Sequence, residues 1–268
     1  MAENNPIGVF DSGLGGLTVL SAIRQRLPYE HLVYFGDTAR VPYGGKSRDT
    51  IVRYSIEIFE FLKTKQVKTI VVACNTASAN AMAELRKLSD IPVLGVIEPG
   101  IWALLKSAAS EKKAAVIATR STIKSNAYEI ALRKENSHIT LFSKPCPLFV
   151  PLIEEGFQDK KITELVIHEY LDEIIREDIK TIILGCTHYP LIKNSINRLY
   201  DNLNLIDSSI ETARTLENLL HEHKLTTEST NPGKTDLYLS DITENLQDLE
   251  TIFYRERIDS VQKVTLGW

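Results

Sequence analysis

The chain has 268 residues, of which 43% are hydrophobic and 25% are charged, as in an ordinary globular protein. This length allows one or two domains and a sizeable buried core. The formal net charge is −4 and the pI is about 5.9, so the composition lacks the basic surplus that binds nucleic acid or an anionic membrane. We expect neither nucleic acid nor a membrane among the partners.

The composition also indicates the cellular compartment. The first residues have neither the basic nor the apolar region of a secretory signal peptide. The longest uncharged stretch, near residues 69–83, is too short to span a bilayer. Three cysteines without a CxxC pair are typical of a reducing compartment rather than of a disulfide scaffold. We therefore expect a cytoplasmic protein.

Short apolar runs alternate with segments of helical periodicity along most of the chain, which predicts repeated βα units. The predicted strands are 7–10, 31–35, 68–74, 93–97, 114–118, 139–142, 180–186, 205–207, 237–240 and 261–266. The predicted helices are 17–27, 47–65 (with Ser47 as N-cap), 77–88, 101–110, 122–135, 163–176, 190–200 and 210–222, with another beginning at Asp241. Repeated βα units imply parallel sheets covered by helices on both faces.

The order of these units suggests two halves. The chain is expected to leave the first half near residue 98 and to return to it near residue 208. We predict an α/β fold of two similar domains, pseudo-twofold related, with mostly parallel sheets flanked by helices and an active site in the cleft between them. The first domain is discontinuous and comprises residues 1–97 and 208–268, and the second comprises the inserted residues 98–207.

Two of the predicted strands are copies of each other. Lys68–Cys74 and Lys180–Cys186 carry Lys, Thr, Ile and Cys at the same places, and each delivers a cysteine where the strand ends. The polar residues that follow are Asn75, Thr76, Thr187 and His188. Ligands of open α/β sheets bind just outside the carboxyl ends of strands. A helix beginning after each turn would offer free N–H groups and a partial positive charge, which bind carboxylates and favour a thiolate.

Motifs for common cofactors are incomplete. The glycine-rich turn at residues 11–16 has Thr18 where a dinucleotide-binding motif needs its third glycine. Gly45-Lys46-Ser47 imitates the end of a phosphate-binding loop, but Arg40 stands where that motif begins with glycine. The cysteines also lack the spacing of a zinc site. We expect no cofactor and no metal.

Two thiols, one from each half, suit a particular kind of chemistry. Cys146, between two prolines, is interpreted as a small buried core residue. Disulfide exchange usually needs adjacent thiols, and a cysteine hydrolase needs one thiol with a histidine. Opposed acid/base groups instead suit inversion of a stereocentre, because one removes a proton from one face and the other returns a proton to the opposite face. Candidate helper groups are Asp11, Glu154 and His188.

The sequence resembles bacterial glutamate racemases over nearly its whole length. The matching segments are 10–19, 36–44, 73–78, 185–191 and 240–244. This resemblance implies a cofactor-independent amino-acid racemase with two α/β domains, usually a homodimer, which makes D-glutamate for peptidoglycan from L-glutamate. One departure is Ala118, where the family often has glycine after the first strand of the second domain.

The resemblance also implies residue roles. Cys74 would act on the D-enantiomer with help from Asp11, and Cys186 on the L-enantiomer with help from His188 and Glu154. The residues expected to hold the amino and carboxylate groups of glutamate are Asp11, Ser12, Tyr43, Gly44, Asn75, Thr76, Thr187 and His188. Glu155, next to Glu154, leaves open which of these two carboxylates assists.

Other interpretations of the same residues remain open. Asp11 could cap the following helix, Tyr43 could anchor its loop, and His188 could be a structural histidine. At the level of function, an aspartate racemase would use the same pair of cysteines. A non-catalytic module that binds an acidic small molecule, or a cysteine hydrolase with a single nucleophile, are further alternatives.

Overall fold

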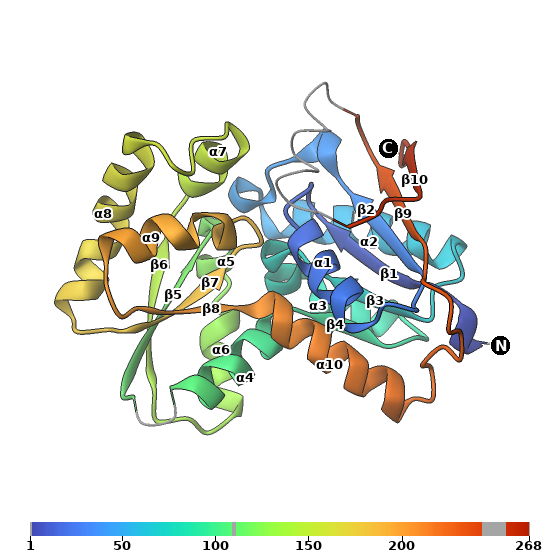
Figure 1. The fold of residues 1–268 in the computed structure, drawn as a ribbon, viewed down its shortest axis with the longest axis horizontal. Coiled ribbons are helices and arrows are strands. Elements are labelled where there is room, and N and C mark those ends of the chain that lie inside the picture. The colour runs from blue at the N-terminus through green and yellow to red at the C-terminus, as the bar shows by residue number, and fades with distance from the viewer. Residues whose placement is uncertain (1, 109–110, 243–255, 268) are drawn as a thin grey trace.

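The computed structural model describes residues 2–108, 111–242 and 256–267, and within them the chain forms two parallel sheets, each flanked by helices (Figure 1). The strands are β1 (Ile7–Asp11), β2 (Leu32–Gly36), β3 (Thr69–Val72), β4 (Val93–Gly95), β5 (Lys113–Ala118), β6 (Thr140–Pro145), β7 (Thr181–Gly185), β8 (Asn204–Asp207), β9 (Thr235–Leu239) and β10 (Ser260–Lys263). The predicted α/β class is confirmed.

The helices follow the strands in the expected alternation. They are α1 (Leu17–Arg26), α2 (Arg48–Thr64), α3 (Asn75–Leu88), α4 (Ile97–Ser107), α5 (Arg120–Lys124), α6 (Ala127–Lys134), α7 (Phe149–Glu154), α8 (Lys161–Arg176), α9 (Lys193–Leu199) and α10 (Ser208–Glu222). Short 3₁₀ helices occupy Ala2–Asn4, Thr38–Arg40, Tyr43–Gly45 and Tyr189–Ile192. Ser47 is the N-cap of α2, as predicted, and its side chain accepts a hydrogen bond from the Thr50 amide.

The larger sheet has the order β10-β9-β2-β1-β3-β4, and each pair of neighbouring strands in it is parallel. All residues of β1, β2 and β3 are buried, which explains why these strands are continuous apolar runs rather than alternating ones. One face packs against α2 and α3 around Phe35, Phe59 and Ile70. The other packs against α1 and α10, through Leu20 and Leu216 among others.

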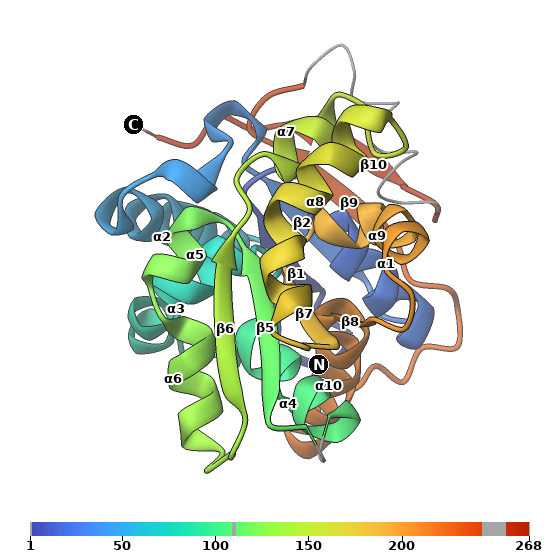
Figure 2. The same cartoon turned by 90° about the vertical axis from the view of Figure 1, so that its left-hand side faces the viewer.

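The smaller sheet has the order β6-β5-β7-β8 and is also parallel. Helices α4 and α6 cover one face through Leu104 and Tyr128, while α7, α8 and α9 cover the other, as the second view shows (Figure 2). Strand β6 lies at an edge of the sheet, where a proline such as Pro145 at its end removes no needed hydrogen bond.

Some predicted boundaries were wrong. Helix α4 begins at Ile97 rather than at 101, because Pro99 sits in the first turn, where no N–H donor is required. The predicted helix 122–135 is divided into α5 and α6 at Asn126, which has a left-handed backbone with φ of 54°. The helix expected from Asp241 falls on residues 243–255, outside the described part of the chain.

The strands of the larger sheet come from residues 7–95 and 235–263, and those of the smaller sheet from 113–207. Helix α10, which follows directly after β8, packs along α1 and contacts α4. The division at residues 97/98 and 207/208 itself stays a prediction. Across the described residues, the structure contains no helix that is both long and apolar enough to cross a membrane.

Candidate active site

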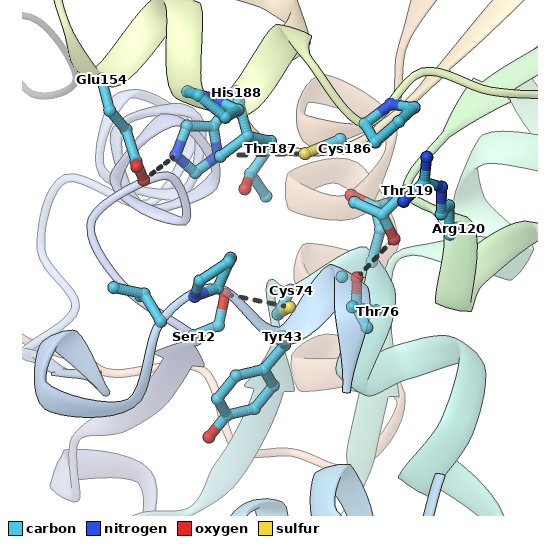
Figure 3. A pocket seen from close by; sticks show the side chains of 18 residues that line it. Ser12, Tyr43, Cys74, Thr76, Thr119, Arg120, Glu154, Cys186, Thr187 and His188 are labelled. Carbon is cyan, nitrogen blue, oxygen red and sulfur yellow. Dashed lines mark hydrogen bonds and ion pairs between the residues drawn. The ribbon is translucent and has the colours of Figure 1, made fainter. Parts of the chain in front are cut away.

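The carboxyl ends of strands from both sheets meet at a shared cavity of about 220 Å³. Cys74 follows β3 and Cys186 follows β7, and Figure 3 shows the two thiols on opposite sides of this cavity. The lining residues are Ser12, Val41, Pro42, Tyr43, Gly44, Gly45, Cys74, Asn75, Thr76, Thr119, Arg120, Pro147, Val150, Pro151, Glu154, Cys186, Thr187 and His188. The duplicated strands therefore bring one thiol from each half to the same space.

Cys74 is 5% exposed and is the N-cap of α3. Its sulfur accepts a hydrogen bond from the Ala77 amide at 3.4 Å and lies 3.5 Å from the Ser12 hydroxyl. Burial, reinforced by the negative charge of Asp11, raises the pKa of Cys74 to about 12. The Ala77 amide of the helix N-terminus does lower the pKa of Cys74, as expected, but desolvation outweighs the bonds from Ser12 and Ala77.

Asp11 ends β1 and is completely buried. One carboxylate oxygen accepts a hydrogen bond from the Gly13 amide at 2.9 Å, so the side chain folds back on the glycine-rich turn. Burial raises the pKa of Asp11, against the opposing charge of His188 and the N–H groups of the turn. Asp11 does not line the cavity; it acts on Cys74 from behind, through its charge. The N-cap of α1 is Gly16, so Asp11 is not the cap of that helix.

Cys186 is 7% exposed and has a different set of neighbours. Its sulfur lies 3.9 Å from Nδ1 of His188, and Nε2 of His188 lies 3.0 Å from a carboxylate oxygen of Glu154 (Figure 3). Burial alone would lower the pKa of His188, but its bonds to Cys186 and Glu154 outweigh that effect and raise the pKa to about 10. The raised pKa favours the protonated imidazole of His188 next to the Cys186 sulfur.

The segment after Cys186 is not a second copy of α3. Thr187 and His188 form a turn, and a four-residue 3₁₀ helix beginning at Tyr189 follows. Cys74 is thus the N-cap of a long helix, whereas at Cys186 the helical segment begins three residues later. It starts as the 3₁₀ helix and continues directly into α9, close to the expected helix 190–200. The charge next to Cys186 comes instead from the His188 imidazole.

Hydroxyl groups from both halves meet at another side of the cavity. Thr76 Oγ1 lies 2.9 Å from Thr119 Oγ1, which in turn lies 3.0 Å from Thr122 Oγ1. Asn75 donates a hydrogen bond to the Tyr128 hydroxyl at 2.8 Å, again across the two halves. These contacts fix Asn75 and Thr76 at the first turn of α3, where both are nearly fully buried.

The structure brings every predicted site residue except Asp11 to the cavity wall. Glu154 contacts His188, whereas Glu155 is exposed and does not line the cavity. The sequence-based prediction missed Thr119 and Arg120, together with an apolar side formed by Val41, Pro42, Pro147, Val150 and Pro151. Thr119 had an available signal, because it follows β5 just as the cysteines follow β3 and β7.

In residues 2–108, 111–242 and 256–267, no group of three or more His, Cys, Asp and Glu side chains is arranged to hold a metal ion. The polar groups that line the cavity are instead hydroxyls, an amide, two thiols, the Arg120 guanidinium and the His188–Glu154 pair. These groups can donate hydrogen bonds to carboxylates and exchange protons with a bound molecule.

Two parallel-sheet units that contribute one thiol each to a shared cavity suit an isomerase better than a hydrolase, which needs one nucleophilic thiol. The sequence matches the Asp/Glu/Hydantoin racemase family over residues 7–216. The chain belongs to this family and is an enzyme of the isomerase class.

Individual relatives agree with the family assignment. The chain is 46% identical to a glutamate racemase of Persephonella marina, with 92% of each chain covered. The solved glutamate racemase of Francisella tularensis in complex with D-glutamate superposes with a TM-score of 0.93 at 42% identity, covering 99% of both chains. An aspartate racemase from Picrophilus torridus superposes with a TM-score of 0.59 at 18% identity, with coverage of 82% of this chain and 98% of that one, which shows likeness of fold alone.

Proposed function

We propose that the protein interconverts L- and D-glutamate by transferring protons at the α-carbon between substrate and two opposed cysteines, without a cofactor. The observation that carries this proposal is the placement of Cys74 and Cys186 on opposite sides of one cavity. The similarity to glutamate racemases over nearly the full chain supports glutamate as the substrate. The more distant likeness to an aspartate racemase gives no comparable support for aspartate.

In the direction from L- to D-glutamate, the Cys186 thiolate removes the α-proton. The C–H electron pair stays on the α-carbon and delocalises into the carboxylate, while Cys186 becomes a thiol. The Cys74 thiol then gives its proton to the opposite face and becomes a thiolate. The reverse direction exchanges these roles, so the enzyme ends each turnover with one thiol and one thiolate.

The two environments support this starting state. Because burial and Asp11 raise the pKa of Cys74 to about 12, this residue holds its proton at neutral pH and is ready to donate it. The His188 cation, held by Glu154, can stabilise the negative charge of a Cys186 thiolate. Ser12, which contacts Cys74, can stabilise a thiolate there after donation.

The polar cavity residues are proposed to hold the substrate. Backbone N–H groups at the start of α3 and the side chains of Asn75 and Thr76 would bind one carboxylate, since a helix N-terminus favours negative charge. The remaining predicted contacts to the amino and carboxylate groups are Ser12, Tyr43, Gly44, Thr187 and His188. Asp11, behind the cavity, would assist Cys74 through its charge rather than by direct contact.

The wider role is proposed from the same resemblance. D-glutamate would be supplied for peptidoglycan synthesis in the cytoplasm, by a homodimer. The proposed domains are residues 1–97 with 208–268, and 98–207. A metal-free mechanism predicts that treatment with EDTA leaves the rate unchanged.

The test is incubation of each glutamate enantiomer in D₂O. We expect deuterium at the α-carbon of the product, and a final mixture with nearly equal amounts of the two enantiomers because they have equal free energies. Label in aspartate but not in glutamate would assign the substrate to aspartate. Binding of glutamate without deuterium exchange at the α-carbon would indicate a non-catalytic binding module. Formation of a covalent acyl-enzyme would indicate a hydrolase.

A further inference from the structure

The loop that forms one wall of the cavity is attached to a buried carboxylate with no assigned role. This loop, Val41–Gly45, contributes all five of its residues to the cavity lining. Asp37 lies just before it, directly after β2, and is completely buried. The segment containing both is one of those that resemble the racemases, yet the proposed chemistry uses only Tyr43 and Gly44 from it.

Asp37 accepts hydrogen bonds from three side chains, two from the loop that follows it and one from the segment after β9. Arg40 Nε donates to both carboxylate oxygens, at 2.9 and 2.7 Å. The Tyr43 hydroxyl donates to Oδ2, and the Ser240 hydroxyl donates to Oδ1 at 2.9 Å. A carboxylate has room for about four such bonds, so the capacity of Asp37 is filled by these donors.

The Tyr43 side chain is fixed by the hydrogen bond from its hydroxyl to Asp37, on the side away from the cavity. Figure 3 shows its ring pointing out of the cavity, with the oxygen at the far end. Burial and the Asp37 carboxylate raise the pKa of Tyr43, so the hydroxyl keeps its proton and stays a donor. The residue lines the cavity through the part nearest its backbone, and its orientation depends on the bond to Asp37.

Arg40 completes the buried charge arrangement. Its guanidinium also bonds to Glu57 of α2 and stacks 3.9 Å above the ring of Tyr54. Tyr54 in turn packs against Tyr43, with ring centroids 5.7 Å apart. The loop is therefore held on one side by α2 and on the other by the carboxylate that follows β2.

The third donor to Asp37 comes from far along the chain. Ser240, directly after β9, donates to Asp37 and accepts a hydrogen bond from the Ala39 amide at 2.8 Å. The Asp241 amide donates to the Thr38 hydroxyl at 2.8 Å. Through these hydrogen bonds, Ser240 and Asp241 support the loop that forms the cavity wall, although neither residue lines the cavity.

We propose that Asp37 is a positioning residue, which holds the Tyr43–Gly44 part of the cavity wall in place, with Ser240 as its partner from the end of β9. Gly44 must lie close to the opposite half, because a Cβ there would come within 2.8 Å of Thr119. A shift of the Val41–Gly45 loop would therefore change both the approach of Gly44 to Thr119 and the width of the cavity. The role in substrate binding rests on the proposed function, but the positioning itself does not.

The experiment compares Tyr43→Phe and Ser240→Ala with Tyr29→Phe, which alters an exposed tyrosine at 48% exposure. The first readout is exchange of the Lys46 amide, which donates to the Tyr43 carbonyl at 3.0 Å. Each test variant loses one hydrogen bond to the buried Asp37 carboxylate. Hydrogen exchange of the Lys46 amide should therefore become about tenfold faster in both test variants, and should not change in the control. Amides of β3 should keep their protection in all three, because the sheet is untouched.

The second readout is racemisation. A displaced wall should raise the KM for glutamate about tenfold and leave kcat within about twofold, since neither cysteine nor its helpers move. Unchanged Lys46 exchange in both test variants, or faster exchange of the β3 amides as well, would overturn the positioning role. A wild-type protein that fails to racemise glutamate would refute the proposed function, while the exchange measurement would still decide the role of Asp37.

Discussion

The two thiol sites have nearly the same sequence before the cysteine and quite different surroundings after it. At Cys74 a 14-residue helix begins, and the helpers are the Ser12 hydroxyl and the buried charge of Asp11. At Cys186 a four-residue 3₁₀ helix follows the turn, and the helper is an imidazole bonded to Glu154. One site is arranged to keep a proton on sulfur, and the other places a cation next to the sulfur.

This difference shows that the repeated strands determine where each sulfur lies, but not which groups surround it. The repeated strands place each sulfur at the carboxyl end of a parallel strand, which a backbone pattern alone can achieve. The groups that surround each thiol come from outside the repeated strands: Ser12 and Asp11 from β1 and its turn at Cys74, and the Glu154 carboxylate of α7, through His188, at Cys186. The proposed mechanism starts in the direction from L- to D-glutamate with a thiol at Cys74, and the raised pKa of that residue agrees with this.

The largest effect is expected from removing either thiol. Cys74→Ser and Cys186→Ser should each reduce racemisation by about 10²–10⁴-fold, the usual contribution of a positioned acid or base. Solvent exchange should separate the two: Cys74→Ser should retain α-proton exchange from L-glutamate and lose it from D-glutamate, and Cys186→Ser should show the reverse. NMR of the α-proton in D₂O measures both.

Cys146→Ala is the matched control for this pair, because Cys146 is a fully buried core residue that does not line the cavity. Racemisation by this variant should stay close to that of the unmodified protein. If either active-site variant racemised at the unmodified rate, or if each exchanged both enantiomers equally, the assignment of one face to each thiol would be wrong.

A smaller effect is expected from the carboxylate behind Cys186. Glu154→Gln removes the charge 3.0 Å from His188, while Glu155→Gln changes an exposed neighbour outside the cavity. Loss of a charge-assisted bond should lower racemisation about tenfold for Glu154→Gln. The Glu155→Gln variant should be unchanged. Equal loss in both variants would contradict the contact seen here.

The same pair of variants has a pH signature. His188 has a folded-state pKa of about 10, above its ordinary value of 6.5, so its protonation stabilises the fold fully below pH 6.5. That stabilisation is lost as the pH rises through about 10. Because Glu154 contributes to the raised pKa, Glu154→Gln should flatten the decline in the unfolding midpoint between pH 6.5 and 10, and Glu155→Gln should not. Thermal unfolding across this range makes the measurement.

Much of the fold and site could be predicted because the signals are local. Continuous apolar runs marked the buried strands, and the repeated strand pointed to Cys74 and Cys186 as a pair. The fold class and the convergence of the polar residues after these strands followed from the rule that parallel strands present their carboxyl ends at one edge. Asp11, Glu154 and His188 were already candidate helpers, and the family resemblance added which cysteine each of them would assist.

The remaining features depend on contacts between distant segments. The break at Asn126 depends on one left-handed residue, and the raised pKa of Cys74 depends on burial that the sequence does not display. The apolar side of the cavity combines Val41 with Val150, from opposite halves. Asp37 lies in a segment that resembles the racemases, but its role depends on donors from two positions in the loop and one after β9, which the sequence does not bring together.

The smallest effect tests the contact between the two thiol sites. Gly15 belongs to the turn after β1, and a Cβ there would lie 2.4 Å from His188 Nδ1 and 2.5 Å from Thr187 Oγ1. Gly15→Ala therefore forces His188 away from Cys186 or separates the two halves, at a cost of about 1–3 kcal/mol, as for other overpacked sites.

Small movements of His188 and Thr187 should relieve part of the steric cost of the added Cβ. Gly15→Ala should therefore lower kcat by only about threefold to tenfold. The control is Gly267→Ala, where an added Cβ meets no atom within 4 Å. The imidazole resonances of His188 should shift in Gly15→Ala and not in the control, which links the lost activity to the displaced ring. An unshifted His188 with reduced activity would mean that the glycine acts on the Cys74 site instead, through the turn that carries Ser12.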